Sequence, residues 1–408
     1  MRKSMNGERK DRLFIIGVIF IWVTLISIPV AFSQATKPPI KIGIMYAFTG
    51  PETFNGKRQL RGWEMALEKR NYKVAGREIK TIVEDDKSDP ATGVTKVNKL
   101  IQFDQIHILG GLINSAVAYA VRDIVDQNKM PTLITMANAG ALTRERRSPY
   151  IFRTFASGGT ASHYMADFLY NDLKLRKAIF TAADYAYGHE HADMFKAEFE
   201  KLGGQVLFQN FSPLGTADFG PYCTELGKYV GKADVLHFVY SGADSIRFVK
   251  TAEEYGLSKK FTMSNWGATE DGSLLNQMKT GAEGGYHISI NIFDIKTPEN
   301  QAYLELNKRK GGIPDPLDFY GYIGAEVILR ALEKVQGNIE AKDEFLKALR
   351  EIKFEGPTGP FEFDPRSQNA LLPLYISKAT KVKQEYGDYL NVMVKIIPKP
   401  QDPWWIGR

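Results

Sequence analysis

From residue 41 onward, short apolar runs alternate with amphipathic stretches, and this alternation limits the fold more than any other feature of the chain. The apolar runs include IKIGIMYAF, IHILGGL, RKAIFTAAD and ADVLHFVY, and candidate helices lie between most of them. A regular strand–helix alternation predicts a parallel β-sheet with helices on both faces. Because crossovers between parallel strands are right-handed, we expect the loops that follow the strands to lie at one edge of the sheet.

The alternation is too long for one doubly wound sheet of about five or six strands, and 408 residues suffice for two domains. Breaks rich in Gly, Pro and Ser lie at residues 148–164, near 284–292 and at 354–367. They predict a chain that crosses between two lobes more than once. After residue 367, LLPLYISKAT and YLNVMVKII indicate antiparallel strands. The tail PQDPWWIGR carries two adjacent Trp, which we expect to cap an apolar edge, with a partner site as the alternative.

The first 35 residues have the pattern of a secretory signal peptide. A basic segment precedes the apolar run LFIIGVIFIWVTLISIPVAF, and the small residues Ser33 and Ala35 stand at the −3 and −1 positions of a cleavage site. Because the apolar run is long, an uncleaved N-terminal anchor is the alternative. No Cys follows the run, so lipoprotein processing is not expected, and no later segment is long and apolar enough to span a membrane. We therefore expect an exported, periplasmic protein.

Charge and cysteine content exclude several classes of function. The formal charge is +6, and five basic against two acidic residues among the first 35 account for half of it. No basic cluster alternates with aromatic residues, so we expect no nucleic-acid partner. Cys223 is the single cysteine, which excludes an intrachain disulfide and makes thiolate-bound zinc or iron–sulfur clusters untenable. A buried structural thiol is the expected role of this residue.

The strand–loop–helix segment at residues 41–69, KIGIMYAFTGPETFNGKRQLRGWEMALEK, stands where nucleotide phosphates are often bound, but it lacks their motifs. A P-loop needs Gly, four residues and then Gly-Lys-Ser/Thr, whereas five residues separate Gly50 from Gly56 and Arg58 follows Lys57. The Gly triplet of dinucleotide-binding folds is absent too. What remains is a helix N-terminus, which suits a carboxylate; a simple N-cap loop is the alternative. Its polar side chains are Thr49, Thr53 and Asn55.

Other polar groupings in the sequence do not indicate a metal site or a catalytic centre. His189 and His191 are two residues apart and diverge on a helix. The segment EDDKSDP lacks the spacing of a calcium loop and is expected to be a strand-to-helix turn in which Asp89 and Pro90 begin the helix. No G-x-S-x-G motif occurs, and His163 has no obvious nucleophile beside it. We expect no catalytic residue, no metal and no cofactor.

Seven segments, taken in order, resemble a known family. They are GIMYAFTGPETFNGKRQLRGWEMA, EDDKSDP, ILGGLINSAVAYAV, MPTLITMANAGALT, PYIFRTF, DYAYG and GPTGPFEFDP. Together they resemble the periplasmic solute-binding proteins of ABC transporters, of the branched-chain amino-acid (Leu/Ile/Val-binding protein) type. The resemblance covers nearly all of residues 40–398.

The resemblance implies an α/β fold of the type I periplasmic binding protein class, with two Rossmann-like lobes joined by a three-strand hinge. It places lobe 1 at residues 36–155 plus 287–355 and lobe 2 at 156–286 plus 356–408. It also implies a monomer without enzymatic activity that closes around a small solute in the cleft and then docks on a membrane permease. Two rivals are a sensor for a membrane receptor and a cofactor-dependent enzyme; the missing Gly motif argues against the enzyme.

The resemblance further implies which residues hold the ligand. In the first lobe, loops after strands would bind the ligand's carboxylate; the matching residues are Asn55, Asn114, Ser115, Ala137 and Asn138. For Asn114 and Ser115, simple N-capping of a helix is the alternative. In the second lobe, Tyr187 of DYAYG matches a tyrosine that lies over the ligand, with core packing as the alternative, and Ala243 matches a cleft position.

Position 266 carries the prediction about ligand class. Branched-chain amino-acid binders place a Glu near this position for the ligand's ammonium, whereas this chain has Trp266, and Glu270 or Asp271 could substitute only after a register shift. A buried ammonium without a carboxylate is costly. The sequence therefore favours an aromatic or aliphatic carboxylate over an amino acid, which stays the alternative, as does a Trp266 that points into the core. The aromatic wall would comprise Trp266, Tyr187, Phe54 and Tyr320.

Overall fold

The computed structural model describes residues 37–267, 272, 274–290, 293–311, 313–385 and 387–405. The predicted signal peptide at residues 1–35 lies outside these residues, as do Glu270 and Asp271. Contacts join the chain from Pro38 onward into one unit. Within the part described, no helix has the length and apolar character needed to cross a membrane.

The first part of the chain forms a six-stranded sheet in the order β2-β3-β1-β4-β5-β6, counting described residues. All neighbouring strands are parallel except the short β2, and β1 pairs with β3 from Ile40 opposite Ile79 to Tyr46 opposite Asp85. The strands are β1 (Ile40–Tyr46), β2 (Lys73–Val74), β3 (Arg77–Asp85), β4 (Ile108–Gly111), β5 (Thr132–Ile134) and β6 (Ile151–Arg153). The helices that pack with them are α1 (Thr53–Glu68), α2 (Pro90–Gln102), α3 (Ser115–Gln127), α10 (Pro316–Lys334) and α11 (Lys342–Arg350).

The second sheet has seven strands within the described chain, in the order β15-β14-β11-β10-β9-β7-β8. Strands β7 to β11 are parallel, while β14 and β15 are antiparallel, as predicted for the segments after residue 367. The strands are β7 (Lys177–Ala183), β8 (Gln205–Ser212), β9 (Val235–Val239), β10 (Thr262–Trp266), β11 (Tyr286–Ser289), β14 (Leu374–Gln384) and β15 (Gly387–Ile397). The accompanying helices are α4 (Gly158–Asp167), α5 (Ala186–Lys201), α6 (Gly220–Gly227), α7 (Gly242–Glu254) and α8 (Leu275–Met278).

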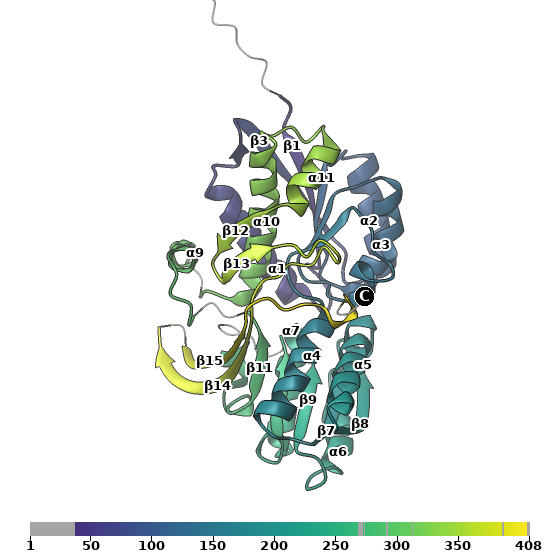
Figure 1. Cartoon of the computed structure of the whole chain (residues 1–408), viewed down its shortest axis with the longest axis vertical. Coiled ribbons are helices and arrows are strands. Elements are labelled where there is room, and N and C mark those ends of the chain that lie inside the picture. Colours follow the sequence, from purple (N-terminus) through teal and green to yellow (C-terminus); the bar gives the residue numbers. More distant parts are fainter. Residues whose placement is uncertain are drawn as a thin grey trace, which may run out of the picture. The chain divides into compact units, whose positions relative to one another are not determined.

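The chain passes between the two sheets three times, which confirms the predicted crossings (Figure 1). It leaves the first sheet after β6, returns between β11 and α10 by way of α9 (Pro298–Arg309), and leaves again after the hairpin of β12 (Lys353–Gly356) and β13 (Gly359–Glu362). The lobe boundaries remain a prediction. The structure places β11 in the seven-stranded sheet, so that sheet extends to Ser289, beyond the boundary expected at residue 287.

Local sequence explains where the elements begin. Asp89 caps α2, since its carboxylate accepts a hydrogen bond of 2.7 Å from the Thr92 amide and Pro90 occupies the first turn. This is the helix start predicted from the sequence. The single cysteine, Cys223, is buried in α6, also as predicted.

Two glycines allow α1 and α10 to approach closely on the first lobe. A Cβ atom added at Gly321 of α10 would lie 1.9 Å from the Gln59 carbonyl oxygen, and one at Gly62 of α1 would lie 1.7 Å from the Asp318 carbonyl oxygen. Nearly every residue of α10 is buried. A segment that comes late in the sequence thus completes the core of the first lobe.

Replacing Gly321 by Ala should destabilise the protein by about 1–3 kcal/mol or more, because the added methyl group forces apart two backbones that cannot yield. Chemical denaturation measures the change in the free energy of unfolding. Gly227→Ala in α6 is the control, since its added Cβ would meet only a Leu257 side-chain carbon at 3.9 Å. A Gly321→Ala protein as stable as the Gly227→Ala protein would contradict this packing.

Candidate ligand-binding site

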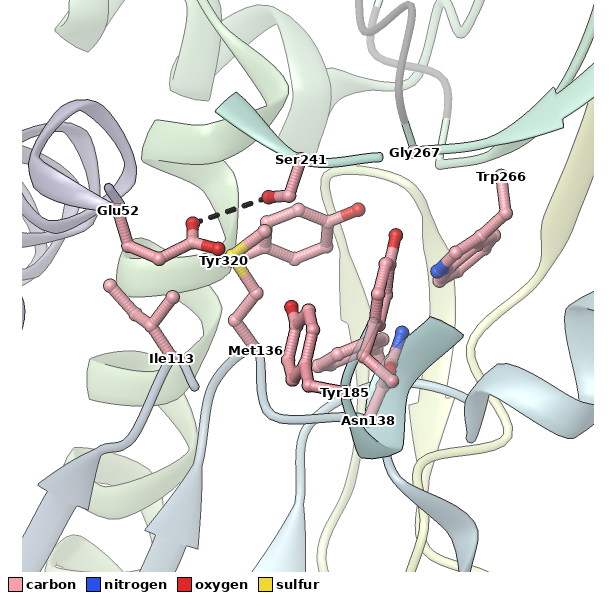
Figure 2. A pocket seen from close by; sticks show the side chains of 11 residues that line it. Glu52, Ile113, Met136, Asn138, Tyr185, Ser241, Trp266, Gly267 and Tyr320 are labelled. Carbon is pink, nitrogen blue, oxygen red and sulfur yellow. Dashed lines mark hydrogen bonds between the residues drawn. The ribbon is translucent and has the colours of Figure 1, made fainter. Parts of the chain in front are cut away.

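A cavity lies between the carboxyl ends of the two sheets (Figure 2). From the six-stranded side it is lined by residues in the loops after strands: Glu52, Ile113, Met136, Asn138 and Phe155. From the seven-stranded side it is lined by residues at or after strand ends: Tyr185, Tyr187, Ser241, Trp266 and Gly267. Tyr320 of α10 completes the lining. The space is about 420 Å³ when its open mouth is included.

Aromatic rings form much of the wall. Trp266 is only 4% exposed; its ring stacks on Phe155 with centroids 6.4 Å apart and on His191 with centroids 5.9 Å apart. Tyr185 and Tyr187 stack on each other at 5.5 Å. Trp266 therefore both faces the cavity and packs within an aromatic cluster. Such a wall suits a flat or apolar ligand body.

The loop that carries Glu52 is fixed by Asp85 at the end of β3. The Asp85 carboxylate accepts hydrogen bonds from the Phe48 amide at 2.9 Å and from the Thr49 hydroxyl at 2.7 Å. Gly50 provides the turn, with φ at +82°, a conformation that favours glycine. Glu52 then stands directly before α1. The acidic EDDKSDP segment thus holds the opening loop in place.

Glu52 is a buried carboxyl group in the cavity wall, 2% exposed. Its Oε2 atom accepts hydrogen bonds from Asn55 Nδ2 and, at 3.3 Å, from the Ser241 hydroxyl. Burial is the largest influence on this group and raises its pKa to about 7, the negative charges of Asp244 and Asp86 adding to the effect while Asn55 and Ser241 oppose it. Glu52 is therefore partly protonated near neutral pH.

The described lining contains no Lys or Arg. His191, which stacks against Trp266, is not a cation either, because burial lowers its pKa well below the ordinary value; its Nε2 atom lies 3.5 Å from Asn138 Nδ2. An anionic ligand would depend on neutral donors such as the Asn138 amide, tyrosine hydroxyls and the Trp266 indole. Hydrogen bonds to a charged group are worth roughly 1.5–3 kcal/mol each. The described residues include no cluster of three or more His, Cys, Asp or Glu placed to hold a metal.

Four of the nine predicted ligand residues line the cavity: Asn138, Tyr187, Trp266 and Tyr320. Asn55 lies behind the wall, where it donates to Glu52 and, at 2.9 Å, to the Ser241 hydroxyl. Four further predicted residues do not line the cavity: Asn114, Ser115, Ala137 and Ala243. Phe54, expected in the aromatic wall, does not line it either.

The structure gives Asn114 and Ser115 local roles. Asn114 caps α3, its side chain accepting hydrogen bonds from the Ala116 and Val117 amides at 2.8 and 3.3 Å. The Ser115 hydroxyl accepts a hydrogen bond of 3.3 Å from the Ala139 amide. The Asn114 contacts are those of the N-capping alternative, whereas Ser115 contacts the loop after β5. Ile113, directly before Asn114, lines the cavity instead.

Seven lining residues were not predicted from the sequence: Glu52, Ile113, Met136, Phe155, Tyr185, Ser241 and Gly267. All lie at or shortly after strand ends, which is the signal that could have identified them. Glu52 had a further signal, because it is the single acidic residue between β1 and α1.

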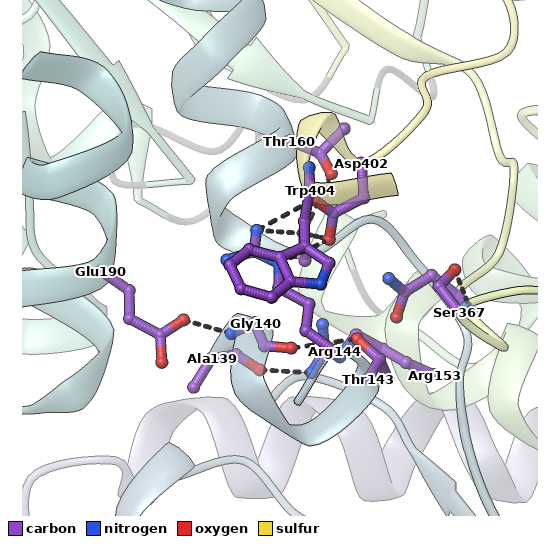
Figure 3. Close-up of polar contacts among 12 residues, drawn as sticks. Ala139, Gly140, Thr143, Arg144, Arg153, Thr160, Glu190, Ser367, Asp402 and Trp404 are labelled. Atoms are coloured by element: carbon purple, nitrogen blue, oxygen red, sulfur yellow. Dashed lines mark hydrogen bonds and ion pairs between the residues drawn. The ribbon is translucent and has the colours of Figure 1, made fainter. Parts of the chain in front are cut away.

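Polar contacts also join the two sides away from the cavity (Figure 3). Glu190 of α5 accepts hydrogen bonds from the Tyr119 hydroxyl of α3 and from the Gly140 amide. Arg144 binds Asp402 of the C-terminal segment through two hydrogen bonds of 3.0 Å, and the Ser157 hydroxyl donates to Asp402 at 2.8 Å. The Arg144 guanidinium lies over the ring of Trp404, 5.9 Å from its centroid; that the two adjacent Trp of the tail cap an apolar edge stays a prediction.

Comparisons with known proteins agree with this architecture. The family model described as "Periplasmic binding protein" matches residues 39–384. The "Leu/Ile/Val-binding protein homolog 6" of Brucella melitensis is 26% identical over 382 residues, which are 91% of this chain and 95% of that protein.

Solved structures give a similar result. An ABC transporter substrate-binding protein from Sphaerobacter thermophilus has a TM-score of 0.83 and 34% identity, covering 90% of this chain and all of that one. A solute-binding protein from Rhodopseudomonas palustris BisB5, in complex with 3,4-dihydroxybenzoic acid, has a TM-score of 0.81 and 26% identity, covering 90% and 99%. One from Rhodopseudomonas palustris HaA2, in complex with p-hydroxybenzoic acid, has a TM-score of 0.82 and 25% identity, with the same coverage.

Replacing Glu52 by Gln should change how stability depends on pH. Because the pKa of Glu52 is raised from 4.5 to about 7 on folding, its contribution to stability falls as pH rises from about 4.5 to 7, by about 3 kcal/mol in total. The Gln variant lacks this loss. Between pH 4.5 and 8 its free energy of unfolding, measured with denaturant, should therefore rise relative to that of the wild type. Glu283→Gln, at an exposed position, should show no such gain; parallel pH profiles for wild type and Glu52→Gln would contradict the burial of a charge here.

Proposed function

The chain belongs to the periplasmic binding protein family, whose model matches residues 39–384, and from this premise we propose that it captures a small carboxylate-bearing solute in the periplasm for an ABC importer. It is a solute-binding protein and not an enzyme. We favour an aromatic or aliphatic acid as the ligand and a membrane permease as the partner that receives it.

The observation that carries the proposal is the chemistry of the cavity. Aromatic rings from both sides enclose it, its polar groups are neutral donors apart from Glu52, and no Lys or Arg stands among the described lining residues. The family resemblance implies that Trp266 stands where the family's amino-acid binders have a carboxylate. Two similar structures are complexes with hydroxybenzoic acids, and a ligand of that kind would fit an aromatic wall with neutral donors.

Closure around the ligand would follow from contacts with both lobes. The cavity takes residues from both sheets, so a ligand that fills it favours the closed arrangement over an open one. Direct contacts across the cleft support that arrangement: Ser241 with Asn55 at 2.9 Å and with Glu52 at 3.3 Å, and Glu190 with Tyr119 and Gly140. Separation of the lobes would break these contacts.

An amino-acid ligand is the second candidate, and Glu52 is the observation that favours it. A buried carboxyl group in the cavity could receive an ammonium from the first lobe, although position 266 offers none from the second. Relatives of this chain carry the name Leu/Ile/Val-binding protein homolog.

A thermal-shift screen with benzoate, 4-hydroxybenzoate, hexanoate and leucine separates the two candidates. A bound ligand stabilises the folded protein by RT ln(1 + [L]/Kd), or about 2.7 kcal/mol at a hundredfold excess over Kd. We expect one or more of the simple acids to raise the melting temperature and leucine to leave it unchanged. Stabilisation by leucine alone would favour the amino-acid candidate and contradict the proposed ligand class.

Replacing Glu190 by Ala should weaken ligand affinity several-fold, because the closed arrangement loses two hydrogen bonds across the cleft while the cavity wall keeps its lining. Titration calorimetry gives the affinity, and small-angle scattering with and without ligand gives the degree of closure. Asp184→Asn is the control; Asp184 pairs with His189 at 2.7 Å on the exposed surface and not across the cleft. Equal affinity and closure in all three proteins would argue against a closing role for Glu190.

A further inference from the structure

We propose that Glu52 is a specificity-determining residue of the cavity, whose free carboxyl oxygen accepts a hydrogen bond from a hydroxyl or amine on the end of the ligand distal to its carboxylate. Acids that carry such a distal donor then bind more tightly than the parent acids. This inference rests on the proposed function, because it takes the ligand to be a carboxylate held in this cavity.

The geometry around Glu52 leaves one oxygen for a ligand. The Oε2 atom accepts hydrogen bonds from Asn55 and Ser241, and Asn55 also donates a hydrogen bond of 2.9 Å to the Ser241 hydroxyl. Among the described residues, none donates a hydrogen bond to Oε1. The carboxyl group is thus oriented by contacts from both sides of the cleft while half of its accepting capacity is unused. A ligand hydroxyl or amine could satisfy that oxygen.

The distribution of charge sets the orientation of the ligand. Asp244 and Asp86 add negative charge near Glu52, so the ligand's carboxylate is repelled from this side. Figure 2 shows Glu52 on one side of the lining residues and Trp266 on the opposite side, with Tyr320 between them. The Asn138 amide and the Trp266 indole offer neutral donors away from Glu52. The carboxylate therefore lies toward Trp266, and the far end of the ligand meets Glu52.

This arrangement distinguishes a distal donor from an α-amino group. In an α-amino acid the ammonium and the carboxylate are attached to the same carbon, so both cannot reach opposite sides of the cavity. In 4-hydroxybenzoate the hydroxyl and the carboxylate stand at opposite ends of a ring. Glu52 accordingly selects for the separation between the two groups as well as for the donor itself.

The protonation state of Glu52 is compatible with this role. Burial raises its pKa to about 7, so both forms are populated near neutral pH. A hydroxyl can donate to the ionised carboxylate or accept from the neutral acid. A ligand that presents only C–H groups would leave the buried carboxyl unsatisfied, which is the kind of mismatch that binding sites discriminate against most strongly.

Calorimetric titration of matched acids tests the assignment. The pairs are benzoate with 4-hydroxybenzoate and hexanoate with 6-hydroxyhexanoate; 4-methylbenzoate controls for size, and 4-aminobenzoate separates an amine from a hydroxyl as the donor. For whichever parent acid binds the wild type, we expect the version with a distal donor to bind about tenfold more tightly or better. In Glu52→Leu that preference should vanish while the parent acid still binds. Glu283→Gln, outside the cavity, should keep the preference.

Each outcome bears on one of the two proposals. Equal affinities within a pair for the wild type, or a preference that survives Glu52→Leu, overturn the role of Glu52 and leave the proposed function intact. Leucine binding that is lost in Glu52→Leu assigns the carboxyl to an α-ammonium and also overturns it. Failure of every acid to bind contradicts the proposed function itself. If Glu52→Leu does not fold, the comparison of 4-methylbenzoate with 4-hydroxybenzoate on the wild type and on Glu52→Gln decides.

Discussion

The direction of the parallel strands is the constraint on which the binding cavity depends. In both sheets the chain leaves each parallel strand at the same edge, so loops from distant parts of the sequence gather there. The alternating pattern of the sequence predicted the parallel sheets, and the breaks rich in Gly, Pro and Ser predicted that the chain crosses between two lobes more than once. The sequence did not place the short strand β11 in one of the two sheets, because that placement depends on its pairing with β10 and with β14, which lies much later in the chain.

The charged side chains that stabilise the framework lie outside the binding cavity. Buried or half-buried ion pairs hold the framework, among them Arg70 with Glu326 at 2.8 Å and Arg144 with Asp402 at 3.0 Å. The cavity, by contrast, has aromatic rings, neutral donors and the one carboxyl group of Glu52. Removing one partner of a buried ion pair leaves an uncompensated charge, so these pairs fix the framework. In the cavity, where Glu52 is the one titratable carboxyl group among the described lining residues, the ligand brings its own charge.

Part of the candidate site was predictable from the family resemblance, where the residues it implied stand at or after strand ends. Trp266 ends β10 and Tyr187 follows β7, and both line the cavity. Asn114 was expected to face the ligand, yet its side chain turns back to cap α3, which is the alternative role that an Asn at a helix start favours. Glu52 was not predicted, because an acidic side chain does not by itself suit a site for an anion. Its environment depends on Asn55 and on Ser241, a contact between segments far apart in the sequence.

The C-terminal segment is part of the folded framework. Asp402 and Arg144 are both buried, and Ser157, at the first crossing between the sheets, donates to the same carboxylate. A chain shortened before residue 402 would strand a guanidinium inside the protein beside that crossing. An affinity tag or a fluorescent reporter joined at this end would therefore disturb the contacts of Asp402 with Arg144 and Ser157. For a solute sensor built from this chain, an exposed loop such as the one that carries Glu283 is the better attachment point.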